Sequence, residues 1–580
     1  MSITFNLKIA PFSGPGIQRS KETFPATEIQ ITASTKSTMT TKCSFNASTD
    51  FMGKLREKVG GKADKPPVVI HPVDISSNLC MIDTLQSLGV DRYFQSEINT
   101  LLEHTYRLWK EKKKNIIFKD VSCCAIAFRL LREKGYQVSS DKLAPFADYR
   151  IRDVATILEL YRASQARLYE DEHTLEKLHD WSSNLLKQHL LNGSIPDHKL
   201  HKQVEYFLKN YHGILDRVAV RRSLDLYNIN HHHRIPDVAD GFPKEDFLEY
   251  SMQDFNICQA QQQEELHQLQ RWYADCRLDT LNYGRDVVRI ANFLTSAIFG
   301  EPEFSDARLA FAKHIILVTR IDDFFDHGGS REESYKILDL VQEWKEKPAE
   351  EYGSKEVEIL FTAVYNTVND LAEKAHIEQG RCVKPLLIKL WVEILTSFKK
   401  ELDSWTEETA LTLDEYLSSS WVSIGCRICI LNSLQYLGIK LSEEMLSSQE
   451  CTDLCRHVSS VDRLLNDVQT FKKERLENTI NSVGLQLAAH KGERAMTEED
   501  AMSKIKEMAD YHRRKLMQIV YKEGTVFPRE CKDVFLRVCR IGYYLYSSGD
   551  EFTSPQQMKE DMKSLVYQPV KIHPLEAINV

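Results

Sequence analysis

The sequence predicts an all-α protein with more than one domain. Apolar residues recur at helical spacing through most of the chain, and short breaks separate these stretches. Only 17 prolines and 23 glycines occur among the 580 residues, so few positions interrupt a helix. Because a domain usually holds about 100–200 residues, this length allows for about two to four domains.

The composition argues against several classes of protein. A formal net charge of −9 disfavours nucleic acid as a partner, because nucleic-acid-binding proteins carry basic surfaces. No apolar run approaches the ~18 residues of a membrane-spanning helix, so we expect no membrane span. The 13 cysteines are scattered, which is typical of free thiols in a reducing compartment rather than of a disulfide framework.

The N-terminal segment differs from the rest in composition. Residues 1–45 contain 14 Ser or Thr and five Lys or Arg, and their only acids are Glu22 and Glu28. This composition is typical of an organelle transit peptide, and an ordinary disordered tail is the alternative. We therefore expect residues 1–50 to be removed or disordered.

Residues 51–243 are expected to form an N-terminal helical domain. From about Ser77 to Ala239 one helical stretch follows another, and no group of chemically active residues stands out. The three consecutive histidines at 231–233 cannot share one helix face, so a surface loop is favoured over a metal site. The turn-rich segment at 235–243 marks the expected domain boundary.

An acidic run ends one helix of the second domain, residues 244–580. Helical periodicity begins near Asp306 and reaches Ile-Asp-Asp-Phe-Phe-Asp-His at 321–327, where two glycines follow as an expected C-cap. Asp322 and Asp326 are four apart and would share one helix face. The helix dipole disfavours each such acid by roughly 0.3–1 kcal/mol. A bound Mg²⁺, which prefers oxygen ligands, would compensate.

A second helix, expected around residues 451–477, carries a polar stripe of similar chemistry. Amide, hydroxyl and carboxylate oxygens are ligands for a hard cation, and a planar guanidinium suits phosphate oxygens. The stripe advances in steps of four residues, with Arg463 beside it: Asp462, Asn466, Thr470 and Glu474.

Each stretch alone has an ordinary explanation. An acidic run is usually a solvated helix end, and a polar stripe is usually the water-facing side of an amphipathic helix. The two stretches lie about 140 residues apart in a helical chain, and their pairing favours one shared metal site.

A glycine interrupts the helix expected around residues 415–438. Glycine inside a helix costs about 1 kcal/mol, so Gly425 predicts a kink or a packing requirement. Four cysteines near this helix could suggest zinc, but their apolar helical context favours packing as small hydrophobic residues. They are Cys426, Cys429, Cys451 and Cys455.

The two stretches resemble the motifs of class I terpene synthases. Asp322-Asp323-Phe324-Phe325-Asp326 matches the DDxxD motif. Residues 466–474, Asn-Asp-Val-Gln-Thr-Phe-Lys-Lys-Glu, match the (N/D)Dxx(S/T)xxxE motif without a departure. From about Ser77 to the C-terminus the chain is similar to the kaurene-synthase-like diterpene synthases of mint-family plants.

The resemblance implies a terpene synthase β-domain at residues 51–243 and a catalytic class I α-domain at residues 244–580. Relatives that protonate their substrate carry a DxDD motif in the β-domain, and this chain has none. Too few residues precede Ser77 for the γ-domain of longer relatives, which we expect to be absent. Class II activity is therefore not expected.

The resemblance also implies roles for individual residues. Three Mg²⁺ ions would bind between the two motifs, and Arg463 and Arg285 would hold the diphosphate. Arg285 matches the first arginine of an Arg-Asp-Arg triplet, whose last arginine is replaced here by Val287. The apolar Ile424 would line the pocket and favour proton loss over capture of water. The implied metal ligands are Asp322, Asp326, Asn466, Thr470 and Glu474, and the implied catalytic residues are Asp322, Asp326, Arg463 and Ile424.

The resemblance finally implies a substrate and a compartment. In the plastid stroma a separate class II cyclase would supply copalyl diphosphate of the normal series, and this chain would convert it to an abietane-type diene such as miltiradiene. Isopimaradiene, a kaurene-type diene, or manoyl oxide from another substrate stay open. A chain-elongating prenyltransferase and an inactive helical scaffold also stay open, although two intact metal motifs and the large N-terminal domain disfavour them.

Overall fold

The computed structural model describes residues 72–111, 119–147, 151–227, 244–284, 287–404, 411–476, 479–490, 496–546 and 556–571. Within these ranges every regular element is a helix, which confirms the all-α expectation. No helix in the described part of the chain is long and apolar enough to cross a membrane. The expected transit peptide at 1–50, the histidines at 231–233 and Arg285 lie outside the described residues.

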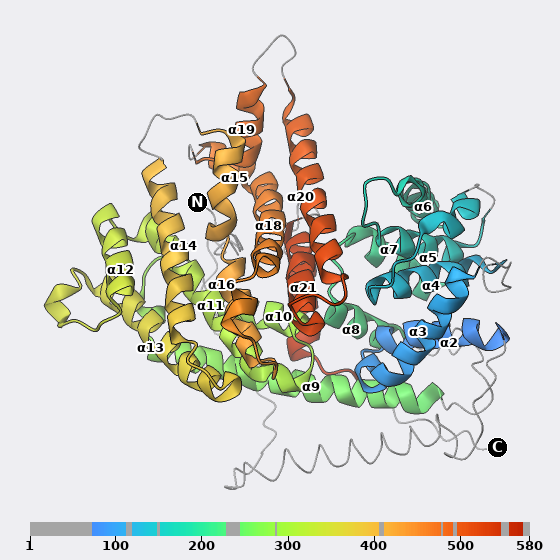
Figure 1. Ribbon diagram of the computed structural model, residues 1–580, viewed down its shortest axis with the longest axis horizontal. Coiled ribbons are helices and arrows are strands. Elements are labelled where there is room, and N and C mark those ends of the chain that lie inside the picture. Colours follow the sequence, from blue (N-terminus) through green and yellow to red (C-terminus); the bar gives the residue numbers. More distant parts are fainter. Residues whose placement is uncertain are drawn as a thin grey trace, which may run out of the picture.

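The N-terminal group of helices, α2 to α8, occupies one side of the molecule (Figure 1). Several of its helices begin at an aspartate whose side chain accepts a backbone N–H of the first turn, as Asp120 does from Cys123 and Asp153 from Thr156. The elements are α2 (Pro72–Ser87), η1 (Asp91–Phe94), α3 (Gln95–Lys110), α4 (Val121–Glu133), η3 (Ser140–Ala147), α5 (Val154–Ser164), α6 (His173–Leu191), α7 (His198–Lys209) and α8 (Asp216–Tyr227).

The second group of helices, α10 to α22, contains both expected motifs. The aspartate run lies at the junction of α11 and η6, and the polar stripe lies on α18. The elements are α10 (Val288–Ile298), α11 (Ser305–Asp323), η6 (Phe324–Gly328), α12 (Arg331–Glu343), α13 (Lys355–Gln379), α14 (Lys384–Ser404), α15 (Leu413–Ser423), α16 (Cys426–Ser433), α17 (Glu443–Leu446), α18 (Gln449–Leu476), α19 (Ser482–Ala489), α20 (Glu498–Val520), α21 (Arg529–Tyr546), α22 (Gln556–Met562) and η9 (Lys563–Tyr567), with short turns η4 (Leu278–Thr280), η5 (Pro302–Phe304), η7 (Ala349–Glu351) and η8 (Leu434–Tyr436).

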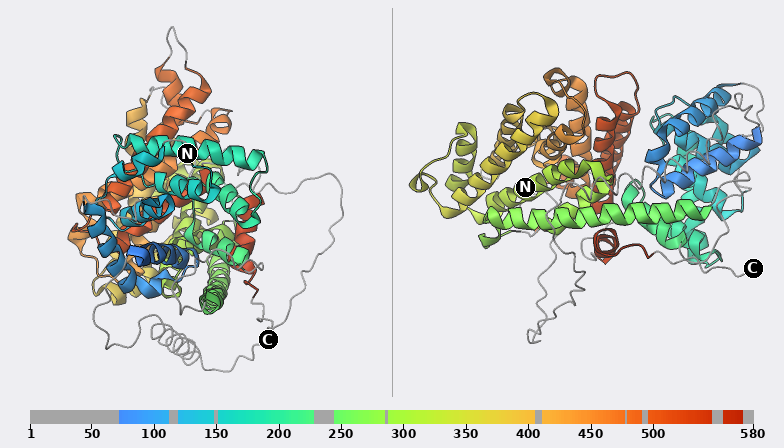
Figure 2. Two further views of the ribbon diagram at one scale, coloured as in Figure 1. Left: turned by 90° about the vertical axis from the view of Figure 1, so that its right-hand side faces the viewer. Right: turned by 90° about the horizontal axis from the view of Figure 1, so that it is seen from below.

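Helix α9 (Lys244–Asp275), 32 residues long, underlies both groups. Figures 1 and 2 show it extending along the base of the molecule from one group to the other. Gln259 of α9 donates hydrogen bonds to the backbone carbonyls of Ser564 and Leu565, so η9 packs on α9. One continuous apolar core extends from Ile75 to Val570 and joins the two groups.

The turn between α7 and α8 presses the N-terminal group against α21. A Cβ added to Gly213 would lie 2.6 Å from the backbone nitrogen of Tyr544, so the two backbones are in close contact. Ion pairs stabilise the same interface: Asp216 of α8 lies 2.7 Å from Arg540, and Arg222 lies 2.7 Å from Asp561. The interface holds α21 in place beside α18.

Candidate active site

Helix α11 brings the aspartate run into the interior of the second group. Asp322 is 1% exposed, so the alternative of a solvated helix end is wrong. At Phe324 the winding changes to a π turn, because the N–H of Gly329 donates to the Phe324 carbonyl five residues back at 2.9 Å. Asp326 lies in this π turn, about one turn after Asp322, which lies close to the end of the α-helical part of the run.

Aromatic rings pack around the π turn. The ring of Phe324 lies 5.7 Å from that of Tyr283, and the ring of Phe325 lies 5.5 Å from that of Phe398 in α14. Each of these adjacent rings must reach a different neighbour. A Cβ at Gly328 would lie 2.7 Å from the Tyr283 ring, so the glycine allows the close approach.

The chain immediately before Arg285 contacts the aspartate run. A Cβ at Gly284, whose φ is +80°, would lie 2.6 Å from Oδ2 of Asp323. Arg320 of α11 holds this segment by donating to the carbonyl of Tyr283 at 2.5 Å. Arg285 itself is not among the described residues, but its neighbour lies beside the first motif.

The polar stripe of α18 is buried. Asn466 is 0% exposed, Glu474 is 2% exposed and Thr470 is 7% exposed, so the stripe is not a water-facing helix side. Both polar side-chain atoms of Asn466 are buried without a hydrogen-bond partner, a state that costs free energy. A bound cation that seeks oxygen would satisfy Oδ1 of Asn466, so the stripe fits Mg²⁺.

Asp462 begins the stripe but has different surroundings. The thiol of Cys426 donates to its Oδ2 at 3.0 Å, and the backbone of Gly542 packs against its other oxygen. Burial raises the pKa of Asp462 to about 8, so the acid is mostly neutral at pH 7. A neutral carboxyl group is a poor ligand for a metal ion, which sets Asp462 apart from the residues that follow it.

The break between α15 and α16 contacts both motif helices (Figure 1). Helix α15 ends at Ser423 and Gly425 adopts a φ of +83°, which confirms the predicted kink. A Cβ at Gly425 would lie 3.1 Å from Cγ1 of Val318, one helical turn before Asp322. Arg463 of α18 donates to Oγ of Ser423 at 2.8 Å. The break thus packs against both α11 and α18, and Ile424, which is 3% exposed, lies within it between Ser423 and Gly425.

Arg463 donates hydrogen bonds to this break and forms an ion pair with α14. Its Nε donates to the carbonyl of Ser420 at 3.3 Å, and its Nη2 lies 3.9 Å from Glu401, which also accepts from Ser423. Burial alone would lower the pKa of this guanidinium, but Glu401 and Asp467 are among the neighbours that raise it above its ordinary value. The arginine therefore stays charged and can hold diphosphate oxygens.

Asp467, a member of the second motif, and Asn481, which lies outside it, orient the motif near the α18–α19 corner. Asp467 accepts hydrogen bonds from the hydroxyl of Tyr416 and from the N–H of Ser482, both at 3.0 Å. Asn481 donates to Oε2 of Glu474 at 2.8 Å. The one sequence signal for Asn481 is the preference for asparagine at the start of a helix.

Within the described ranges, no three His, Cys, Asp or Glu side chains come together as a metal site of their own. Mg²⁺ does not need such a cage, because it keeps several waters and takes substrate phosphate beside one or two carboxylates. Zinc does need such a set, so the zinc interpretation of the four cysteines is wrong. Burial raises the pKa of the Cys426 and Cys429 thiols, which fits inert packing residues.

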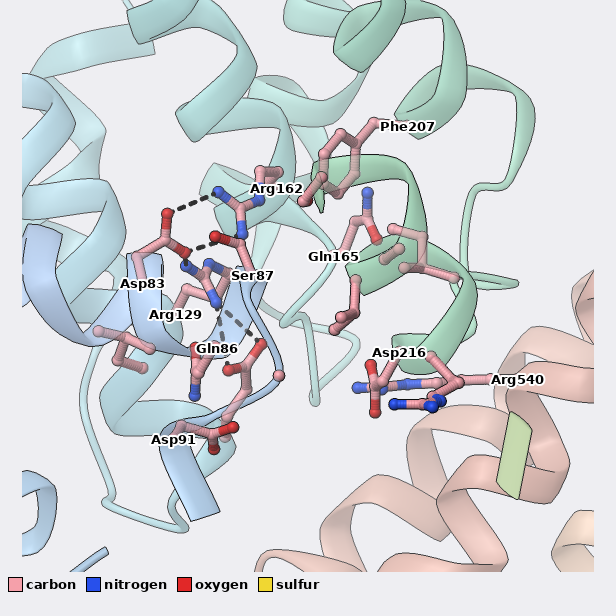
Figure 3. A pocket seen from close by; sticks show the side chains of 18 of the residues that line it. Asp83, Gln86, Ser87, Asp91, Arg129, Arg162, Gln165, Phe207, Asp216 and Arg540 are labelled. Carbon is pink, nitrogen blue, oxygen red and sulfur yellow. Dashed lines mark hydrogen bonds and ion pairs between the residues drawn. The ribbon is translucent and has the colours of Figure 1, made fainter. Parts of the chain in front are cut away.

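A cavity of about 1320 Å³, lined by several charged side chains, lies between the two groups of helices (Figure 3). Asp83 accepts from Arg129 and Arg162 on its wall, and the ion pair of Arg540 and Asp216 lines another part of it. Burial raises the pKa of Asp83, but the two arginines outweigh burial and lower the pKa to about 2. No residue of either motif lines this cavity, so it is separate from the metal site.

The comparisons with known proteins identify the family. A miltiradiene synthase of Isodon rubescens is 68% identical, over 100% of this chain and 94% of the relative. A class I diterpene synthase of Vitex agnus-castus is also 68% identical, over 100% of this chain and 99% of the relative. This chain belongs to the terpene synthase family. Two family models agree: residues 27–208 match the N-terminal domain of terpene synthases, and residues 274–515 match the metal binding domain.

The fold of this terpene synthase is found in solved structures. Abietadiene synthase from Abies grandis aligns with a TM-score of 0.78 at 25% identity, over 92% of this chain and 72% of that chain. The protein is thus a class I diterpene synthase, an enzyme that acts on a diphosphate with the help of a bound metal. The family assignment disfavours both the prenyltransferase and the inactive scaffold. The match to the N-terminal domain begins at residue 27, inside the expected transit peptide.

Proposed function

We propose that this terpene synthase converts copalyl diphosphate of the normal series into an abietane-type diene, miltiradiene, and releases diphosphate. The observation that carries the proposal is that the break between α15 and α16 contacts both helices that carry the buried polar motifs, at Val318 of α11 and at Arg463 of α18. The apolar Ile424 lies in this break. The name of the Isodon rubescens relative, at 68% identity, supports the product.

The metal site that we propose uses oxygen ligands from both motifs. The orphaned Oδ1 of Asn466 and the buried carboxylate of Glu474 support it. Bound Mg²⁺, expected as three ions, supplies positive charge that stabilises the diphosphate as the allylic C–O bond breaks. Arg463 and Arg285 would contact the diphosphate. The proposed ligands are Asp322, Asp326, Asn466, Thr470 and Glu474.

The rest of the mechanism follows from the apolar side of the site. Ile424 offers no hydrogen bond to a water molecule, so it favours loss of a proton from the last carbocation over capture of water. Asp462, mostly neutral at pH 7, adds little negative charge to the buried interior of the α-helical bundle. The charged Arg463 would keep the released diphosphate bound while the cation rearranges.

We also propose how the chain is divided and where it works. Residues 1–50 form a plastid transit peptide, residues 51–243 the β-domain and residues 244–580 the catalytic α-domain. The start of α9 at Lys244 and the word chloroplastic in the names of the relatives support this division and a stromal location. Because the chain has no DxDD motif, a separate class II cyclase must supply the bicyclic diphosphate.

The test offers purified protein that begins at Asp50 three substrates in separate reactions with Mg²⁺: geranylgeranyl, normal copalyl and ent-copalyl diphosphate. Mass spectrometry should find miltiradiene from normal copalyl diphosphate alone, and no turnover once the Mg²⁺ is chelated. Turnover of geranylgeranyl or ent-copalyl diphosphate would overturn the proposed substrate. A different tricyclic diene or a hydroxylated product would overturn the proposed product, and a longer prenyl chain would indicate a prenyltransferase.

A further inference from the structure

The corner between α18 and α19 folds back onto the metal-binding stripe. Just after α18 the N–H of Thr479 donates to the carbonyl of Glu474 at 2.9 Å, and α19 begins at Ser482, directly after Asn481. Asn481 is 3% exposed, so its side chain is enclosed between the two helices. This residue belongs to neither of the two motifs.

Asn481 uses both ends of its amide. Its Oδ1 accepts the N–H of Val483 at 2.8 Å, which caps the N-terminus of α19. Its Nδ2 donates to the carbonyl of Asp467 at 2.9 Å and to Oε2 of Glu474 at 2.8 Å. Asp or Ser would cap the helix equally well, but neither side chain offers an amide N–H₂ with two donors. The helix cap needs only the side-chain oxygen, whereas the two donated hydrogen bonds need the amide group of an asparagine.

We propose that Asn481 is a positioning residue for Glu474. By holding Oε2, it fixes the rotation of the carboxylate and presents the group to the metal in one orientation. Residues that hold metal ligands by hydrogen bonds typically change metal affinity by about 10- to 100-fold when removed. The inference rests on the proposed role of Glu474 as a metal ligand.

The surroundings make this contact rigid. Asp467, whose carbonyl accepts from Asn481, is itself held by Tyr416 of α15 and by the N–H of Ser482. Asp467 is 0% exposed, so water does not compete for these hydrogen bonds. Three helices thus fix the position of the Asn481 amide before any ligand binds, as a precise metal site requires.

Two variants distinguish the effect of losing the helix cap from the effect of losing the hydrogen bond to Glu474. Asn481→Ser keeps an oxygen that can cap α19 but lacks the amide donor, and Asn481→Ala lacks both. We expect the Ser variant to melt near the wild-type temperature without metal, and the Ala variant to melt several degrees lower. With inorganic diphosphate present, calorimetry should show about 10-fold weaker Mg²⁺ binding for both variants.

Turnover gives a second readout. The Ser variant should need about 10-fold more Mg²⁺ for half-maximal rate and should approach the wild-type kcat at saturating Mg²⁺. Wild-type Mg²⁺ affinity in the Ser variant would overturn the inference and leave the proposed function intact. A wild-type protein that binds no Mg²⁺ with diphosphate would overturn both.

Discussion

His314 shows at the scale of one residue how burial fixes a charge state near the site. It lies two helical turns before Asp322 in α11 and is 0% exposed. Its Nδ1–H donates to the carbonyl of Ala310 at 2.7 Å, and its Nε2 accepts from the amide of Asn432 at 2.5 Å. Burial lowers its pKa to about 4, so the neutral ring ties α11 to α16.

The free energy of unfolding should therefore fall as the pH drops below about 6.5. Between the folded pKa of about 4 and the ordinary value of 6.5, the unfolded chain binds more protons at His314 than the folded chain does. This contribution is intact above pH 6.5 and is lost progressively toward pH 4, with an upper limit of about 3 kcal/mol. The free energy of unfolding, measured with urea at a series of pH values, should change less with pH for a His314→Gln variant than for the wild type. An equal dependence on pH would contradict a buried, neutral His314.

Spacing along the sequence predicts which side chains are candidate ligands, but not which residues orient them. Asn466 and Glu474 follow from a motif within one helix. Glu401 contacts Arg463 and Asn481 contacts Glu474 from other elements, and no periodic pattern reports such contacts. Burial is also a tertiary property: the same stripe on α18 would face water if α15 and α19 packed elsewhere.

At the scale of the element, two irregular turns shape the site, and only one of them was predictable. Gly425 stands out in a helical pattern because glycine is a poor helix former, and the structure breaks there. The π turn at Phe324 leaves no such mark, because its sequence suits an α-helix equally well. At this turn Phe325 packs against Phe398 of α14, a contact that the sequence does not reveal.

The same Gly→Ala substitution should have opposite effects in two helices. At Gly425 the left-handed φ of +83° and the 3.1 Å approach to Val318 should make Gly425→Ala destabilising by about 1–2 kcal/mol. Gly484 lies inside α19, and its Cβ would meet Phe471 at an ordinary 3.8 Å, so Gly484→Ala should stabilise by about 0.5–1 kcal/mol. Thermal melts of the two variants check both signs, and a stable Gly425→Ala variant would refute the account of the break.

Ile424 should determine whether the last carbocation loses a proton or captures water. An Ile424→Asn variant places an amide that can hold a water molecule beside the break, so part of the diene should be replaced by a hydroxylated diterpene. Mass spectrometry of the products measures the ratio, with Ile424→Val as a control that keeps the pocket apolar. An Asn variant that forms no hydroxylated product would count against this role.

At the scale of the whole molecule, the two groups of helices share a continuous core across α9 and α21. The sequence predicted two helical regions and the turn-rich segment between them. It did not predict that α9 extends beneath both groups (Figure 2), because an amphipathic pattern identifies an apolar face but not its partner. The close backbone contact of Gly213 with Tyr544 is likewise visible only in the folded chain.

The interface between the groups should be sensitive to one methyl group. Gly213→Ala would force the backbones of α21 and the α7–α8 turn apart, since the new Cβ would lie 2.6 Å from Tyr544, and should cost about 1–3 kcal/mol. Gly300→Ala serves as the matched control, because its Cβ would meet only Cδ of Arg217, at an ordinary contact distance of 3.4 Å. Chemical unfolding should separate the variants, and equal stability would show that the groups are not pressed together here.

The most direct test of the central claim is Mg²⁺-dependent binding of inorganic diphosphate, measured by calorimetry for the wild type, Asp322→Asn, Asn466→Ala and the double variant. If the two motifs form one metal site, each single variant should lose about 10-fold or more in affinity, and the double variant should lose far less than the product of the two. Binding that does not depend on Mg²⁺, or losses that multiply as for independent sites, would contradict a shared metal site.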